Sequence, residues 1–387
     1  MDTQKLDQTY IANTYARFPV TIVKGKGSLV WDDTGKEYID LSTGIAVDIF
    51  GVADEEWMAA VAKQLGTLQH ISNLYYTEPC VKLAQMLCEK TGMKKVFFGN
   101  SGAEANECAI KAARKWSEEK KGKDYSTIIT LKNSFHGRTI TTLAATGQDV
   151  FHHDFTPLTE GFVYAEPNDL ANLEQLIKAN KCAAVMMEVV QGEGGVMPLD
   201  EAYVKGAAKL CEQYDLLLIC DEVQVGNGRS GKLYGYMHYG VQPDIVSTAK
   251  GLAGGLPLGA TLLGEKVQDV LSAGTHGSTF GGNPVCCAGA INVLSRLDEK
   301  MLEGVEERSA YIKQELAGAK GVLGVSGLGL MLGIQTEKNA SDIIAACREK
   351  GVLVIKAKDK LRLLPALNIP MEQLQKAVAV IKACCAE

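Results

Sequence analysis

Short apolar runs alternate with longer segments of helical apolar spacing from about residue 55 onward. Buried strands separated by helices are typical of a parallel sheet with helices on both faces. The pattern therefore predicts an α/β fold with a large, doubly wound and mostly parallel sheet. The runs expected to be buried strands lie, in chain order, at 95–98, 126–131, 183–187, 216–220 and 245–247.

The N-terminal end carries a different pattern, in which short strands dominate. Apolar runs at 20–23 and 29–31 and the segment 38–40 predict three strands. The polar residues 32–36 predict a hairpin-like turn between the last two of them.

At the C-terminal end, Ser341 is expected to cap a helix that ends at Gly351. A strand is expected over 352–355, and Pro370 is expected to open the last helix. These elements predict a smaller α+β domain that both chain ends build together. The predicted regions are an N-terminal arm with part of the small domain at 1–47, a large domain at 48–284, and the rest of the small domain at 285–387.

The composition narrows the class of protein. The chain has 387 residues, 46% of them hydrophobic, and a formal net charge of −6, which is typical of a globular protein. Because it has no basic block, we expect no nucleic acid or membrane surface as a partner. No apolar stretch approaches the roughly 18 residues of a membrane span, and residues 1–7 lack the apolar core of a secretory signal.

The cysteines and histidines predict neither disulfides nor a metal site. The number of cysteines, eleven, is odd, and none has CxxC spacing, so we expect reduced thiols in a cytoplasmic protein. No pair among the six histidines has the helical spacing of metal ligands with an acid or a thiol nearby. We therefore expect no bound metal.

Residues that could bind a ligand or take part in a reaction follow three of the predicted strands. They lie at the sheet edge where α/β folds bind ligands. After the first strand, small residues at 99–104 open a helix, whose free N–H groups and positive dipole end suit a phosphate. Asp221 directly follows the fourth strand, and an acid there needs a positive or donor partner once it loses water. Lys250 follows the fifth strand, where burial would lower its pKa and leave a nucleophilic amine.

Each feature alone also has a plain structural explanation. The small residues could only make a turn and a cap, Asp221 could cap a turn, and most lysines are solvated. Together the three features match the needs of pyridoxal phosphate, which are an anion site, an acid at the ring nitrogen and a lysine for the aldehyde.

Residues 226–231 match the pattern G-x-G-x-x-G of dinucleotide-binding folds. That pattern belongs at a junction between a strand and a helix, whereas 232–236 has no helical apolar period. We therefore expect no dinucleotide site here. A nicotinamide-dependent dehydrogenase stays open as an alternative.

Six segments resemble class III aminotransferases, a fold-type I family of pyridoxal-phosphate enzymes. They keep the family's order, and the resemblance extends from about residue 14 to residue 381. It implies the fold-type I architecture, pyridoxal 5'-phosphate as cofactor, and a homodimer with shared active sites. The segments are 100–107, 135–139, 191–195, 221–224, 248–250 and 277–284.

The resemblance implies roles for residues that would hold the cofactor ring. Lys250 would bond to its aldehyde carbon and later move the proton during transamination. Asp221 would pair with the ring nitrogen, and Gln224 would hydrogen-bond toward the ring hydroxyl. Glu222 and Val223 complete this cofactor-binding segment.

Further residues would hold the phosphate and the ring face. Gly102 and Ala103 would bind phosphate through backbone N–H groups, next to Ser101. Phe135 would stack on the ring, although without the resemblance it would be a plain core aromatic. Thr279 would reach the phosphate bound by the neighbouring subunit.

The resemblance also implies a substrate site. Arg138 would grip a substrate carboxylate with its two-pronged guanidinium, although a surface ion pair is the ordinary role of an arginine. Ser278 would lie beside the substrate. Glu193 would pair with Arg362 while an ω-amino donor is bound, and would release it for the α-carboxylate of glutamate.

The activity that this resemblance implies is transfer of an amino group from N2-acetylornithine to 2-oxoglutarate. The products would be N-acetylglutamate 5-semialdehyde and glutamate, in arginine biosynthesis. Other donors stay open, among them succinylornithine, ornithine and 4-aminobutyrate, because similar substrates often differ by only about 1–3 kcal/mol in a pocket. A pyridoxal-phosphate aminomutase is a further alternative. A non-catalytic member of the fold would be expected to lack Lys250, which is present.

Overall fold

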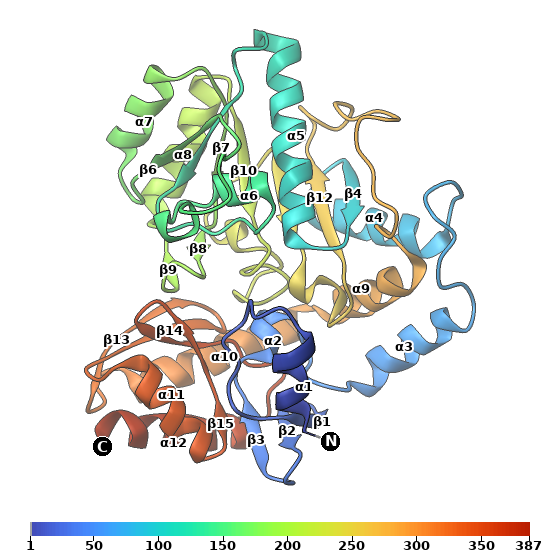
Figure 1. Ribbon diagram of the computed structural model, residues 1–387. Coiled ribbons are helices and arrows are strands. Elements are labelled where there is room, and N and C mark those ends of the chain that lie inside the picture. The colour runs from blue at the N-terminus through green and yellow to red at the C-terminus, as the bar shows by residue number, and fades with distance from the viewer. Residues whose placement is uncertain (1) are drawn as a thin grey trace.

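The computed structural model describes residues 2–387 and contains one large sheet and several smaller ones (Figure 1). The large sheet has seven strands in the order β4-β12-β11-β10-β7-β5-β6. All run parallel except β12, which is antiparallel to its neighbours β11 and β4. The prediction of a doubly wound, mostly parallel α/β sheet is confirmed. The strands are β4 (Lys95–Gly99), β5 (Thr127–Leu131), β6 (Phe162–Ala165), β7 (Cys182–Met187), β10 (Leu217–Asp221), β11 (Ile245–Thr248) and β12 (Gly259–Leu263).

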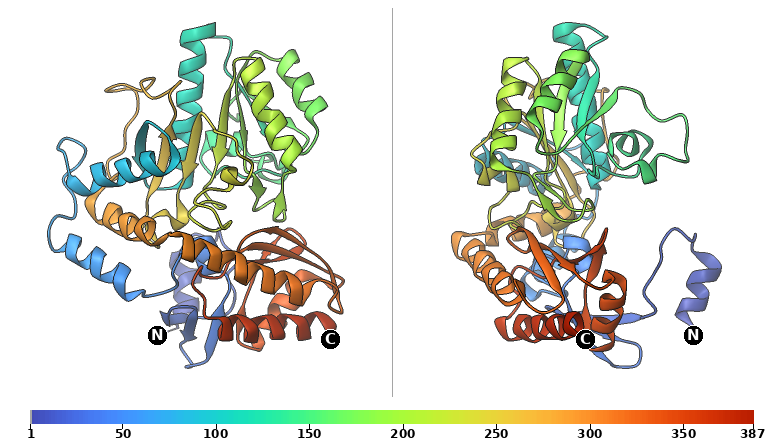
Figure 2. Two further views of the ribbon diagram at one scale, coloured as in Figure 1. Left: turned by 180° about the vertical axis from the view of Figure 1, so that it is seen from behind. Right: turned by 90° about the vertical axis from the view of Figure 1, so that its left-hand side faces the viewer.

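Helices cover both faces of this sheet (Figure 2). Met186 of β7 packs in one buried cluster with residues of α5 (Gly102–Lys121). The next residue, Met187, belongs to the cluster that contains residues of α8 (Glu201–Gln213). Because successive side chains of a strand point to opposite faces, α5 and α8 lie on opposite sides of the sheet. Two further helices near the sheet are α6 (Ile140–Ala145) and α7 (Leu170–Ala179).

Two strands of the large sheet, β6 and β12, have no counterpart in the sequence prediction. β6 has only four residues, three of which keep some exposure, so no buried apolar run marks it. β12 begins at Gly259, where a Cβ atom would lie 2.2 Å from the backbone oxygen of Ser101. Only glycine fits so close to another backbone, and the start of this buried strand therefore reads as part of a glycine-rich turn.

One of the smaller sheets joins segments that are far apart in the chain. Its strand order is β1-β2-β3-β15, and β15 runs parallel to β3. The first strand begins two residues later than predicted. Its pairing with β2 starts at Lys26 and Leu29, beside the turn at Gly27 (φ +60°), and runs outward from there. The strands are β1 (Ile22–Lys26), β2 (Leu29–Asp32), β3 (Glu37–Asp40) and β15 (Val352–Leu353).

Another small sheet carries Arg362. Its order is β13-β14-β17-β16, and Arg362 of β17 lies opposite Gly333 of β14. Helices α10 and α11 pack on its strands, and α12 packs against both helices. The elements are β13 (Val322–Leu328), β14 (Met331–Thr336), β16 (Ile355–Ala357), β17 (Lys360–Leu363), α10 (Glu299–Leu316), α11 (Ala340–Glu349) and α12 (Met371–Ala386).

Two details of the C-terminal prediction are wrong, and one holds. Asn339, not Ser341, caps α11, because its side-chain oxygen accepts a hydrogen bond from the Ser341 N–H. The strand expected over 352–355 is two short strands, β15 and β16, because the chain passes from one sheet to the other at Val354. Pro370 directly precedes α12, as predicted.

Helix α9 (Pro284–Arg296) packs against α3 (Glu55–Leu65) and α4 (Glu78–Thr91). The predicted boundary at 284/285 separates α9 from these two helices, so the division into domains stays a prediction. A short helix, α2 (Thr43–Ala46), follows β3. Within residues 2–387 no helix combines the length and the hydropathy that crossing a bilayer requires.

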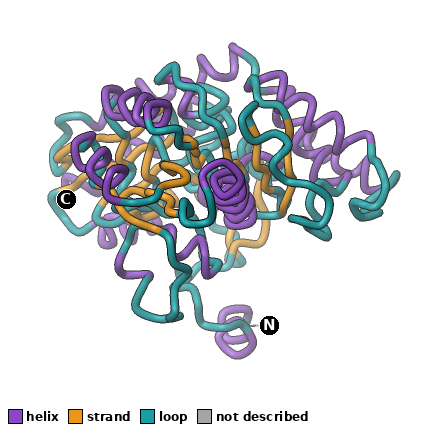
Figure 3. Tube along the Cα trace, turned by 90° about the horizontal axis from the view of Figure 1, so that it is seen from above, coloured by secondary structure: helices purple, strands orange, loops and turns teal. Residues whose placement is uncertain are grey.

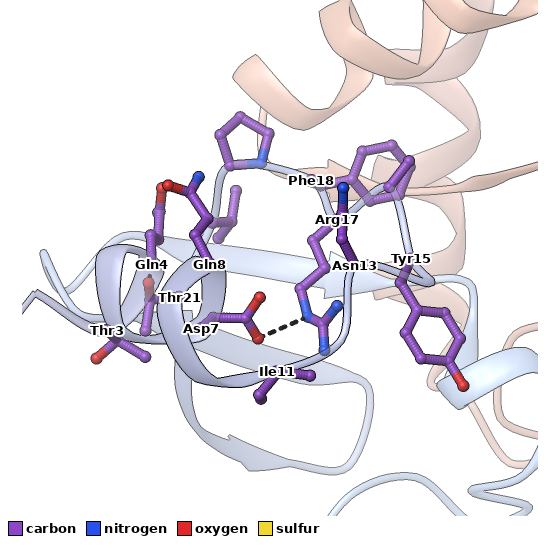
Figure 4. Close-up of a pocket in the computed structure, with 13 residues that line it drawn as sticks. Thr3, Gln4, Asp7, Gln8, Ile11, Asn13, Tyr15, Arg17, Phe18 and Thr21 are labelled. Atoms are coloured by element: carbon purple, nitrogen blue, oxygen red, sulfur yellow. Dashed lines mark hydrogen bonds and ion pairs between the residues drawn. The ribbon is translucent and has the colours of Figure 1, made fainter.

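The N-terminal arm lies beside the body of the protein (Figures 2 and 3). Its helix α1 (Thr3–Tyr10) buries none of its residues. The arm folds back on itself, with Arg17 Nε 3.2 Å from Asp7 Oδ1 (Figure 4). Its apolar side chains Tyr10, Tyr15 and Phe18 remain exposed.

Candidate active site

Asp221 and Lys250 lie at the same edge of the large sheet. Asp221 is the last residue of β10, and it is paired with Ser247 of the adjacent parallel strand β11. Lys250 follows two residues after the end of β11 and has a left-handed backbone, with φ +46°. The strand ends therefore bring together the acid and the amine that the sequence predicted separately.

Hydrogen-bond donors surround the Asp221 carboxylate, which is almost fully buried. Its Oδ2 lies 2.8 Å from His136 Nδ1 and accepts a 2.8 Å hydrogen bond from Asn106 Nδ2. Its Oδ1 accepts a hydrogen bond of 3.0 Å from the Val223 N–H. These contacts hold the carboxylate in one orientation. Sequence reasoning assigned no role to His136 or Asn106, although both lie in segments that carry the resemblance.

A second buried acid, Glu188, holds the segment that contains Phe135. Its two carboxylate oxygens accept hydrogen bonds from the N–H groups of Phe135, at 2.8 Å, and Gly192, at 3.2 Å. Burial raises the pKa of Glu188 to about 7. No sequence pattern marks this residue beyond its place after a buried strand.

The carboxylate of Glu222, next to Asp221, is hydrogen-bonded to the backbone. It is fully buried, and its carboxylate accepts hydrogen bonds from the N–H groups of Gly235, at 2.7 Å, and Tyr236, at 2.8 Å. Burial raises the pKa of Glu222 to about 8. Glu222 therefore anchors the chain that follows β10, and these contacts point away from a direct role at a ligand.

The N-terminus of α5 has N–H groups without an acceptor inside the helix, and it packs closely against the segment after Asp221. Ser101 is the N-cap, and its Oγ accepts a hydrogen bond of 3.2 Å from the Glu104 N–H. Gly102 and Ala103 occupy the first turn, where N–H groups have no acceptor inside the helix. A Cβ atom on Gly102 would lie 2.6 Å from Val223 Cγ1, so this position requires glycine. The predicted phosphate-binding turn thus adjoins the segment after Asp221.

Burial lowers the pKa of the Lys250 amine. Glu193 opposes this shift and Arg362 adds to it, and Asp221 and Glu188 are the other charges near the amine. An amine with a lowered pKa is neutral, and hence nucleophilic, at a lower pH than a solvated lysine.

Arg362, Glu193 and Gln224 form one hydrogen-bonded cluster. Arg362 is 3% exposed, and its Nη1 lies 2.5 Å from Glu193 Oε1 and 3.0 Å from Gln224 Oε1. Gln224 Nε2 also donates to Glu193 Oε1, at 3.3 Å. Burial alone would raise the pKa of Glu193, but the nearby Arg362 outweighs it and lowers that pKa. Glu193 lies in the turn between β8 (Val190–Gln191) and β9 (Met197–Pro198).

Three predicted residues lie at the surface around this site or next to it. Arg138 is exposed, and its guanidinium lies over the rings of Phe135, 5.6 Å from the centroid, and Phe151, at 4.5 Å. Ser278 Oγ accepts hydrogen bonds from Asn100 Nδ2, at 3.2 Å, and from the Gly281 N–H, at 3.0 Å. Thr279 itself is exposed.

The run at 226–231 does not form a dinucleotide site. It lies in a turn after β10, and the next element is a short 3₁₀ helix, Gly235–His238. The dinucleotide fingerprint instead opens an α-helix directly after a strand. The dehydrogenase alternative therefore has no structural support.

The chemistry of these groups fits pyridoxal phosphate. A buried carboxylate with three donors can pair with a protonated ring nitrogen, a helix N-terminus with bare N–H groups can hold a phosphate, and an amine of lowered pKa can react with an aldehyde. The fold and the site thus define a pyridoxal-phosphate enzyme.

Comparisons with known proteins give the family. The family model described as "Aminotransferase class-III" matches residues 10–385. The chain belongs to the class III aminotransferases, which are pyridoxal-phosphate-dependent enzymes. The family, the cofactor and the enzyme class that the sequence predicted are confirmed.

Relatives of known name cover nearly the whole chain. An acetylornithine aminotransferase of Haemophilus ducreyi is 50% identical over 99% of this chain and 98% of its own length. An N-acetylornithine aminotransferase structure from Stenotrophomonas maltophilia is 36% identical, with a TM-score of 0.86 and coverage of 99% of this chain and 98% of that one. An ornithine aminotransferase structure from Toxoplasma gondii is 33% identical, with a TM-score of 0.95 over 99% of this chain and 94% of that one.

Proposed function

We propose that this aminotransferase moves the ω-amino group of N2-acetylornithine to 2-oxoglutarate. The products are N-acetylglutamate 5-semialdehyde and glutamate, and the reaction belongs to arginine biosynthesis. The observation that carries the proposal is the ion pair of buried Arg362 with half-buried Glu193 beside Lys250, because it allows one site to accept an ω-amine and an α-amino acid in turn. Full-length relatives named acetylornithine aminotransferase support the choice of donor.

Lys250 and Asp221 perform the proton chemistry. When bound, pyridoxal phosphate carries the amino group between substrates and takes up the electron pair released at carbon. The neutral Nζ of Lys250 removes the proton from the substrate carbon that bears the amino group and later returns a proton. Asp221 would pair with the ring nitrogen of the cofactor, and His136 and Asn106 hold its carboxylate in place.

Backbone groups and Phe135 orient the cofactor. The N–H groups of Gly102 and Ala103, beside the Ser101 cap, bind the phosphate at the positive end of α5. Phe135 would cover one face of the ring, and Glu188 fixes the Phe135 backbone at its N–H group. Val223 packs against Gly102 and so ties the phosphate turn to the ring-binding segment.

Two arginines handle the substrate carboxylates. Arg138 binds the side-chain carboxylate of glutamate in one half-reaction and the α-carboxylate of the ω-amino donor in the other. Ser278 lies beside the substrate. While the donor is bound, Glu193 and Gln224 occupy the Arg362 guanidinium. Glu193 turns away for glutamate, whose α-carboxylate then takes both prongs of Arg362.

The substitution Arg362→Ala separates the two half-reactions. The specificity constant in single turnover should fall by about 100-fold for glutamate, because two charged hydrogen bonds are lost, and by less than about tenfold for N-acetylornithine. Stopped-flow absorbance of the cofactor measures both. Arg138→Ala is the matched control and should slow both half-reactions. Equal losses for Arg362→Ala in both would contradict the assignment of Arg362.

The proposed donor is tested by an absorption cycle of the purified holoprotein. N-acetylornithine should bleach the yellow form of the cofactor, and 2-oxoglutarate should restore it. Ornithine is the second candidate donor, since an ornithine aminotransferase structure superposes with a TM-score of 0.95; succinylornithine and 4-aminobutyrate complete the panel. A higher specificity constant for any of these than for N-acetylornithine would overturn the donor, and turnover without an oxo acid would favour an aminomutase.

We further propose a homodimer in which each subunit supplies Thr279 to the other subunit's phosphate site. Thr279 is exposed and adjoins Phe280, which is 60% exposed. The nearby segment at 74–76 exposes three more large side chains, and its Tyr75 and Tyr76 line one hollow together with Thr279. A second copy of the chain would cover these apolar side chains and complete the site.

The double substitution Tyr76→Asp with Phe280→Asp tests the dimer. Burying two charges at the interface should shift the protein to a monomer of half the mass in analytical ultracentrifugation, with loss of activity. Leu323→Asp, at an exposed apolar residue of β13, is the control and should leave mass and activity unchanged. A native protein that is active as a monomer would refute the shared site.

The cysteines support a cytoplasmic location, which we add to the proposal. All eleven are free, and nine of them are buried. Thiols persist in this form in the reducing cytoplasm.

A further inference from the structure

The turn at 226–231, which resembles a dinucleotide fingerprint, contacts backbone segments on both sides of the active site. Three of its residues have left-handed backbones: Asn227 with φ +57°, Gly228 with φ +84° and Gly231 with φ +88°. A Cβ atom on Gly228 would lie 2.8 Å from Leu297 and 2.9 Å from Leu367, so the turn packs closely against the C-terminal part of the chain. Its glycines serve packing rather than a phosphate.

One side of the turn holds the segment of Lys250. The Asn227 side chain is buried, and its Nδ2 donates hydrogen bonds to the Ala249 oxygen, at 3.0 Å, and to Thr248 Oγ1, at 3.1 Å. Ala249 directly precedes Lys250, whose own backbone is left-handed. Asn227 therefore fixes the point from which the Lys250 side chain starts.

The other side of the turn holds the segment of Arg362. Arg229 is fully buried, and its Nη1 donates hydrogen bonds to the backbone oxygens of Pro365 and, at 3.3 Å, Leu330. The Leu330 N–H donates in return to the Arg229 oxygen, at 2.9 Å. Pro365 follows β17, which carries Arg362, and Leu330 precedes β14, which pairs with β17.

Burying Arg229 in this way is costly for the fold. Within residues 2–387 no carboxylate pairs with its guanidinium, whose Nε and Nη2 have no hydrogen-bond partner, and burial lowers its pKa to about 9. A buried charge that only carbonyl oxygens compensate is less favourable than an apolar side chain of similar volume. Stability alone therefore gives no reason for an arginine here, whereas its hydrogen bonds join two segments that must stay in register with the active site.

We propose that the turn at 226–231 is a joint that fixes Lys250 and Arg362 relative to each other, with Asn227 and Arg229 as positioning residues. The inference rests on the proposed function, in which Lys250 serves both half-reactions and Arg362 serves only glutamate and 2-oxoglutarate. Loosening the Arg229 contact therefore impairs one half-reaction, and loosening the Asn227 contact impairs both. A merely structural turn would show no such division.

Gly329→Ala disturbs the Arg229 side of the joint without removing a charge. Gly329 has φ +50°, and its Cβ atom would lie 2.5 Å from the Arg229 oxygen. Gly318→Ala is the matched control, since Gly318 has φ +73° and no atom within 4 Å of the same position. Both variants carry the backbone strain of a left-handed alanine, and only the first displaces the joint. Arg229→Met removes the buried charge, and Arg229→Lys retains it.

The KM for glutamate should rise about tenfold or more in Gly329→Ala and Arg229→Met, with the KM for N-acetylornithine unchanged within about twofold, because small displacements of a binding group are costly. The dissociation constant of 2-oxoglutarate from the resting holoenzyme, measured by calorimetry, should rise to the same extent. Arg229→Lys should recover part of the loss. Asn227→Gly, which tolerates the left-handed backbone, should slow both half-reactions equally.

The inference is overturned if Gly329→Ala behaves like Gly318→Ala, or if it slows both half-reactions equally. If Arg229→Met does not fold, the Gly329→Ala and Asn227→Gly pair decides the question by itself. Failure of the proposed function is distinguishable, since the native protein would then pass no amino group to 2-oxoglutarate. Melting temperatures of all variants separate a displaced joint from general loss of stability.

Discussion

Burial of an amine beside a buried carboxylate, at the ends of two adjacent parallel strands, is the constraint on which the rest of the structure depends. Asp221 ends β10 and Lys250 follows β11, so the sheet itself sets their separation. Burial lowers the pKa of Lys250, and three hydrogen-bonding partners, His136, Asn106 and the Val223 N–H, hold the Asp221 carboxylate. The sheet edge thus offers an amine of lowered pKa beside a carboxylate that hydrogen bonds hold in place.

The cluster of Arg362, Glu193 and Gln224 keeps the buried guanidinium of Arg362 paired. An arginine that must bind one substrate's carboxylate is a liability while a substrate without that carboxylate is bound, because it would remain buried and unpaired. Glu193 and Gln224 compensate Arg362 from within the chain. This pairing joins the turn between β8 and β9 to β17, two segments that come from different sheets.

The sequence predicts what local patterns control. Apolar runs locate the parallel strands, and Asp221 and Lys250 follow from their places at strand ends. His136 and Glu188 went unassigned because their roles depend on contacts with distant residues, and no local pattern marks such contacts. The pairing of Glu193 with Arg362 was accessible only through resemblance to a family, since the two are 169 residues apart. Strand β12 was missed because close backbone packing demands glycine at its start.

The account depends most directly on Lys250 as the residue that carries the cofactor. Reduction of the holoprotein with borohydride makes the linkage between lysine and cofactor permanent, and peptide mapping by mass spectrometry then locates it. The account predicts the cofactor mass on the single peptide that contains Lys250 and on no other. A label on a different lysine, or a holoprotein that acquires no label, would contradict it.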